Sequence, residues 1–157
     1  MVDKELIMRF RSLLPASRGV RELRNSEAEV VTERVKSHFV EEPDAIWWWE
    51  ALSSNSVSIR YGSADGLKLL GCLIPSQELV RLAVTDDEPG HWPVFEGEAG
   101  ALCSLVREIP FFEFFVTSME CDWVVFDTHH NCLVVTGALL QRARCLMGVA
   151  FKGGTEL

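Results

Sequence analysis

The chain has 157 residues, of which 48% are hydrophobic and 24% are charged. These proportions are typical of a globular protein that buries a core, and no apolar run is long enough to predict a membrane span. The formal net charge is -8, and residues 41–128 contain four Lys or Arg against sixteen acidic residues. A surface of this charge repels phosphate backbones, which argues against nucleic-acid binding and favours a basic protein partner. The alternative is that the acidic surface serves solubility alone.

The cysteines and the N-terminal residues indicate the compartment. The five cysteines are odd in number and lack any CxxC spacing, so we expect reduced, mostly buried thiols without disulfides or zinc. The N-terminal residues mix charges and lack an uninterrupted apolar segment, so no secretory leader is expected. Both observations predict a cytoplasmic protein. The cysteines are Cys72, Cys103, Cys121, Cys132 and Cys145.

Helical periodicity dominates the first third of the chain. Apolar residues recur at helical spacing over 6–14, and Pro15 ends the run. Ser26 and Glu29 have the spacing of a capping box, which predicts the start of a second helix. A third, short helix is predicted over 45–52. The adjacent indoles of that helix cannot all face one core, because neighbours on a helix lie about 100° apart, so at least one should reach a surface.

After residue 53 the pattern changes to strands. Val57, Ile59 and Tyr61 alternate with polar residues, which is typical of a half-buried strand. Further strands are predicted over 79–85, 91–95, 111–118, 121–127 and 132–136, and helices over 64–72, 97–106 and 138–150. We therefore predict a single α+β domain over 1–157, mostly helical in 1–52 and mostly strand in 53–137. Its N-terminal helices should pack on a mainly antiparallel sheet of about five to six strands.

The last predicted hairpin is apolar on both faces. If Asp127 and Cys132 pair across the turn, Val125 lies opposite Val134, and the other face is also apolar. This pattern favours central strands that are covered on both sides, or covered on one side and used as an interface on the other.

The turn of this hairpin is the candidate site. Asp127, His129, His130 and Asn131 gather there between apolar strands, either as a cap of the sheet edge or as a small site. A catalytic reading would combine His129 and His130 with Glu113 and His91. Adjacent histidines point apart and no other ligand pair has metal spacing, so neither a metal nor another cofactor is expected. The residues proposed for binding are Trp47, Trp48, Asp86, Asp87, Glu88, Asp127, His129, His130 and Asn131.

Four short motifs carry a family resemblance: WPVFEG at 92–97, FEFF at 112–115, DW at 122–123 and DTHHN at 127–131. Together they resemble a bacterial family of uncharacterised proteins with a FWVYEG, FEYY, DWL and ENHHN signature, best over 79–137. Asp127 stands where that family usually has Glu, and Phe114 and Phe115 stand where it has tyrosines. The loss of these hydroxyls weakens proton chemistry at the site. The resemblance implies no activity, only an analogy in size and fold to immunity proteins.

Two functions follow as hypotheses. The first is a cytoplasmic interaction module, immunity- or antitoxin-like, that presents an acidic face to a basic partner. The second is a small enzyme or ligand-binding domain that uses the Asp127–Asn131 turn with His91 and Glu113. The oligomeric state stays open, with a homodimer as one option. A pocket lined by the turn would favour the second hypothesis, and a flat acidic face with exposed tryptophan the first.

Overall fold

The computed structural model describes residues 4–42, 44–53, 55–85, 91–109 and 112–152. The helices are α1 (Lys4–Leu13), α2 (Asn25–Phe39), α3 (Gly66–Leu73), α4 (Ala99–Arg107) and α5 (Leu140–Lys152), with 3-10 turns η1 (Leu14–Ala16) and η2 (Trp48–Glu50). The strands are β1 (Arg21–Glu22), β2 (Ser56–Arg60), β3 (Leu79–Val84), β4 (Val94–Glu98), β5 (Phe114–Ser118), β6 (Trp123–Thr128) and β7 (Cys132–Gly137).

The strands form one antiparallel sheet in the order β1-β4-β3-β5-β6-β7-β2. The predicted α+β class is confirmed, but the described chain has seven strands rather than five to six. The additional strand is β1, which pairs with β4 through only two residues. Two residues are too few to show an alternating pattern, so sequence periodicity does not reveal this strand.

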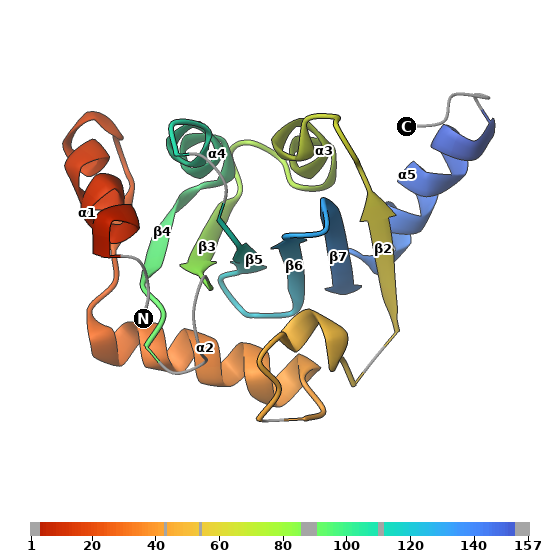
Figure 1. The fold of residues 1–157 in the computed structure, drawn as a ribbon, viewed down its shortest axis with the longest axis horizontal. Coiled ribbons are helices and arrows are strands. Elements are labelled where there is room, and N and C mark those ends of the chain that lie inside the picture. Colours follow the sequence, from red (N-terminus) through yellow and green to blue (C-terminus); the bar gives the residue numbers. More distant parts are fainter. Residues whose placement is uncertain (1–3, 43, 54, 86–90, 110–111, 153–157) are drawn as a thin grey trace.

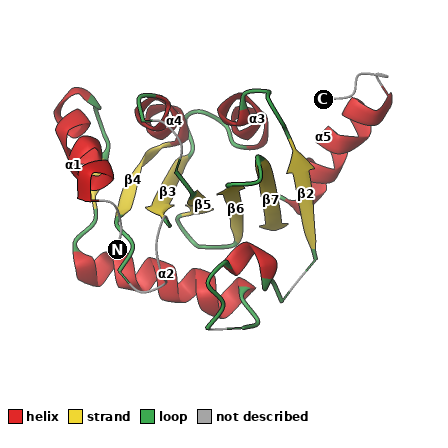
Figure 2. Cartoon of the chain, in the orientation of Figure 1, coloured by secondary structure: helices red, strands yellow, loops and turns green. Residues whose placement is uncertain are grey.

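Each face of the sheet carries its own buried cluster. Figure 1 and Figure 2 show helices on both sides of the sheet, with α2 on one side and α3 and α4 on the other. On one face, α2 and η2 contribute Val31, Val35 and Trp48, which pack with sheet residues such as Phe115 and Phe126. On the other face, buried residues of α1, α3, α4 and α5 pack with the alternate sheet residues. The central strands are therefore apolar on both faces, as the last hairpin predicted.

The N-terminal segment differs from the prediction in two details. Helix α2 begins at Asn25, and the carboxylate of Glu27, not Glu29, accepts the backbone N–H of Arg24 at 2.9 Å. Residues 45–52 contain only the short turn η2 instead of a helix. The reason is that the backbone N–H of Glu41 donates to the carbonyl oxygen of Ala51 at 2.8 Å, which holds this segment as a closed loop.

The register of the last hairpin is shifted by one residue from the prediction. Thr128 pairs with Cys132 and Asp127 with Leu133, so Val125 lies opposite Val135 rather than Val134. The turn has three loop residues and ends at Asn131, whose positive φ of 55° is the left-handed conformation that closes such loops. Because both faces of this hairpin are buried, either register leaves two apolar faces, and the hydrophobic pattern does not select one.

All five cysteines are free, but their burial differs from the prediction. Only Cys121 is buried, whereas Cys72 and Cys145 are exposed. The exposed thiols lie on α3 and α5, where helical spacing turns their positions away from the sheet. Within the described residues, no helix combines the length and the apolarity needed to cross a membrane.

Candidate functional site

The candidate site lies at the end of the sheet, on the face that α3 and α4 cover. On β6, Trp123 and Val125 belong to the buried cluster of that face, and Asp127 follows two residues later on the same side. Strand β2 pairs with β7, and the backbone N–H of Tyr61 donates to the carbonyl oxygen of Asn131 at 3.0 Å. Strand pairing therefore brings Tyr61 next to Asp127, although 66 residues separate them in the chain.

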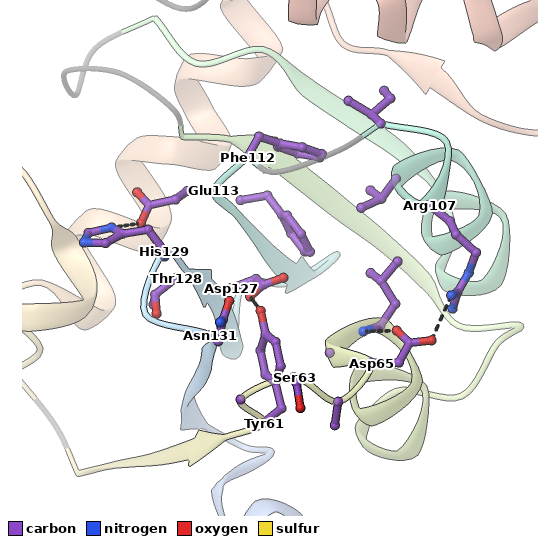
Figure 3. Close-up of a pocket in the computed structure, with 17 residues that line it drawn as sticks. Tyr61, Ser63, Asp65, Arg107, Phe112, Glu113, Asp127, Thr128, His129 and Asn131 are labelled. Atoms are coloured by element: carbon purple, nitrogen blue, oxygen red, sulfur yellow. Dashed lines mark hydrogen bonds and ion pairs between the residues drawn. The ribbon is translucent and has the colours of Figure 1, made fainter.

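A pocket of about 670 Å³ opens beside this pair. In the view of Figure 3, Glu113 and His129 lie on one side of the pocket, Arg107 lies on the other, and Tyr61 lies between them. The volume falls within the range of small-molecule sites. Apolar side chains form much of the wall: Leu67, Val106, Ile109, Phe112 and Phe114.

The central interaction of the pocket joins Tyr61 and Asp127. The Tyr61 hydroxyl donates to Oδ1 of Asp127 at 2.7 Å (Figure 3). Burial raises the pKa of Asp127 to about 6, with a further increase from the negative charge of Glu113, although the hydrogen bond from Tyr61 opposes the change. Burial and the same hydrogen bond also raise the pKa of Tyr61 above its ordinary value. The pair therefore places a carboxyl group that titrates near neutral pH in a pocket wall.

An ion pair closes the far side of the pocket. Nη1 of Arg107, at the end of α4, donates to Oδ2 of Asp65 at 2.8 Å. Asp65 is also the N-cap of α3, where its Oδ1 accepts the backbone N–H groups of Leu67 and Lys68. The hydrogen bond from Arg107 and these backbone bonds lower the pKa of Asp65. This side of the pocket is therefore held in shape by a charged pair that bridges α3 and α4.

Glu113 holds the β6–β7 turn against the start of β5. Its Oε1 accepts the backbone N–H of His129 at 2.8 Å and also contacts Nδ1 of the same residue. The ring of His129 packs beside two indoles that also contact each other, with ring centroids 5.5 Å from Trp47 and 5.7 Å from Trp49. Of the residues that the sequence grouped as a catalytic set, the structure thus brings Glu113 and His129 into contact. The turn connects the pocket to the tryptophan loop of residues 41–52.

Several predicted residues lie away from this pocket. His130 packs against Trp49 and does not line the pocket. His91 is highly exposed and approaches Glu29 of α2 instead, so the structure does not bring it to the turn. Trp48 is buried in the core, with its ring centroid 4.6 Å from that of Trp92, so its role is packing rather than surface binding. The predicted residues Asp86, Asp87 and Glu88 lie outside the described residues.

The sequence prediction missed most of the pocket lining, including the residues Tyr61, Asp65, Arg107 and Phe112. One signal was available, because Tyr61 is the only tyrosine of the chain and directly follows strand β2. The other residues appear as an ordinary helix cap, a helix-end cation and an apolar residue. Only the pairing of β2 with β7 and the packing of α3 beside α4 bring them to one place.

The carboxyl groups and apolar walls of the pocket suit a small molecule that carries hydrogen-bond donors and an apolar part. Among the described residues, no group of three or more His, Cys, Asp or Glu is arranged to hold a metal ion. The pocket lining contains three carboxyl groups and one guanidinium, which gives a formal charge of -2 when His129 is neutral. Carboxyl groups accept hydrogen bonds from cationic and neutral donors, and a carboxyl with a pKa near neutral is also suited to proton transfer.

Comparison with known proteins gives one match. A family model described as Family of unknown function (DUF6756) matches residues 13–146. No curated protein and no solved structure matches this chain at a significant level. The matched segment contains every pocket residue and the four motifs of the sequence resemblance. The chain therefore belongs to this family of unknown function.

Proposed function

We propose that the chain is a small-molecule binding domain and that the pocket around Tyr61 and Asp127 is its binding site. The observation that carries this proposal is the carboxyl group of Asp127 at the end of a buried sheet face, opening on a pocket of about 670 Å³. This is the second of the two functions considered from the sequence, in a modified form. The turn contributes Asp127, His129 and Asn131, but His91 and His130 are not part of the pocket.

The energetics of Asp127 support a functional role. Burial disfavours the ionised form of a carboxyl group, which is why the pKa of Asp127 is raised. An ionised Asp127 therefore lowers the stability of the folded chain. An asparagine at this position would accept the same hydrogen bond from Tyr61 without that penalty. Residues that reduce stability in this way cluster at binding and catalytic sites.

Fragment binding followed by NMR tests the proposal. We expect polar fragments with an apolar part to shift the backbone amide signals of Tyr61 and Asp127 at millimolar concentration or below. Gly66→Ala provides a variant of the pocket, because a Cβ at Gly66 would lie 2.7 Å from Cζ of Tyr61 and would move that ring. Gly71→Ala is the matched control on the same helix, since no atom lies within 4 Å of its Cβ position.

The proposal predicts different fragment affinities for Gly66→Ala and Gly71→Ala. Fragments should bind the wild type and Gly71→Ala equally, and Gly66→Ala at least several-fold more weakly. Fragments that bind all three proteins equally, or a library that shifts no pocket signal, would contradict the proposal.

A second candidate function is the interaction module, and one surface favours it. The loop of residues 41–52 exposes Ile46 (60%) and Trp47 (43%) among acidic side chains. The exposed acidic residues of this loop are Glu41, Glu42, Asp44 and Glu50. Aromatic residues are enriched at protein interfaces, and acidic side chains around them complement a basic partner. Trp47→Ala should abolish binding to a basic partner protein recovered with the wild-type chain, while pocket binding is retained.

A further inference from the structure

The two oxygens of the Asp127 carboxyl group have different surroundings. Oδ1 accepts the hydrogen bond of Tyr61, whereas no described residue donates a hydrogen bond to Oδ2. An ionised carboxylate accepts several hydrogen bonds, and Oδ2 is open to a donor, because among the described residues only Nε1 of Trp48 is a buried side-chain polar atom without a partner. In the close-up of Figure 3, Asp127 lies beside Tyr61 in the pocket wall. A ligand in the pocket is therefore a candidate donor for this oxygen.

The charges around the pocket favour a positively charged hydrogen-bond donor over a neutral or negative group. Arg107 is bound to Asp65, and these two opposite charges largely offset each other at the far side. The other carboxyl groups of the lining are those of Asp127 and Glu113. Glu113 also contacts Nδ1 of His129, and its negative charge raises the pKa of Asp127. A negative ligand would be repelled by this pair of carboxyl groups. A positive group beside Asp127 would gain from both.

The walls of the pocket indicate that the rest of the ligand is apolar. Tyr61, Phe112 and Phe114 supply aromatic rings to the lining, and the rings of Phe112 and Phe114 lie 5.4 Å apart. Leu67 and Val106 add aliphatic surface. Aromatic rings attract cations through their faces and also bury apolar groups. These walls fit a molecule that carries an apolar body and a single positive end.

We infer that the ligand of this pocket is an organic amine, with its ammonium group on Oδ2 of Asp127 and its apolar body against Tyr61, Phe112 and Phe114. This inference rests on the proposed function and names the chemical class of the ligand. A charge-assisted hydrogen bond to a carboxylate is about twice as strong as a neutral one. The ammonium group should therefore decide affinity, while the apolar walls tolerate variation in the body.

A matched set of three compounds tests the class. 2-Phenylethylamine, 2-phenylethanol and 3-phenylpropanoate share an aromatic body and differ in the charge of one end. Binding is measured by calorimetry and NMR at pH 8, with the wild type, Asp127→Asn and the exposed control Asp44→Asn. We expect the amine to bind the wild type at least about tenfold more tightly than the other two compounds, which corresponds to about 1.4 kcal/mol.

The variants show whether Asp127 is responsible. Asp127→Asn should weaken the amine about tenfold or more and leave the alcohol within about twofold, whereas Asp44→Asn should change neither. Equal or tighter binding of the alcohol or the propanoate would overturn the amine class and leave the pocket as a binding site. The same conclusion follows if all three compounds fail while the fragment screen finds neutral or anionic binders in the pocket. If no fragment of any charge binds there, the proposed function fails as well.

Discussion

Replacing Asp127 with asparagine should stabilise the protein in a strongly pH-dependent way. Burial raises the pKa of this carboxyl group from an ordinary value of 3.8 to about 6 in the folded chain. Between these two values the folded chain holds the proton while the unfolded chain has released it. The folded state therefore binds more protons in this window, and the free energy of unfolding falls as the pH rises from about 4 to 6.

The size of the effect follows from the two pKa values. A difference of about two pKa units corresponds to roughly 3 kcal/mol, which is an upper bound because the open pocket admits water. Asparagine retains an oxygen that accepts the hydrogen bond of Tyr61 and carries no charge to desolvate. We therefore expect Asp127→Asn to be more stable than the wild type by about 2–3 kcal/mol at pH 8, and nearly equal to it below pH 4.

Urea unfolding followed by tryptophan fluorescence at pH 3.5, 5, 6, 7 and 8 measures this difference. Asp44→Asn, which removes an exposed carboxyl group, is the control and should follow the wild type across the series. An Asp127→Asn variant that is less stable than the wild type at pH 8 would refute the reasoning. A constant difference at every pH would also refute it, because the effect would then not come from ionisation of Asp127.

Three further predictions concern the stability of the fold. Gly137 has a φ of 82°, and a Cβ there would clash with the carbonyl oxygen of Asp122, so Gly137→Ala should lower the free energy of unfolding by more than about 2 kcal/mol. A loss below about 1 kcal/mol in urea unfolding would contradict this. Phe10 is fully buried, and Phe10→Ala should lose about 3–5 kcal/mol, whereas Met8→Ala on the exposed side of α1 should stay within about 0.5 kcal/mol. Equal losses would argue against the buried face assigned to α1. Glu113→Ala removes the acceptor of a backbone N–H in the β6–β7 turn, and thermal unfolding should show a loss of about 1–3 kcal/mol. If the backbone amides of the turn exchange with solvent at the same rate in Glu113→Ala and in the wild type, the hydrogen bond from His129 to Glu113 does not stabilise the turn.

The local elements of this protein follow from its sequence. Strand β2 and helix α3 appear as predicted because their residues alternate with a period of two or recur at helical spacing. Glu113 and His129, which the sequence grouped as site candidates, meet because they lie next to the neighbouring strands β5 and β6. The departures occur where the pattern carries no information, as in the two-residue strand β1 and in the register of a hairpin that is buried on both faces.

The sequence indicated the turn that contributes Asp127 and His129, but the tertiary structure decided which residues complete the pocket. Its central pair joins Tyr61 to Asp127 because β2 pairs with β7, a strand distant in sequence, at the edge of the sheet. Hydrophobic periodicity does not encode which strands become neighbours. The ion pair of Asp65 and Arg107 likewise exists only because α3 packs beside α4. Periodicity records which face of an element is buried, whereas the order and packing of the elements determine which polar ends meet. The chemistry of this site therefore lies in contacts between residues that are ordinary in their own segments.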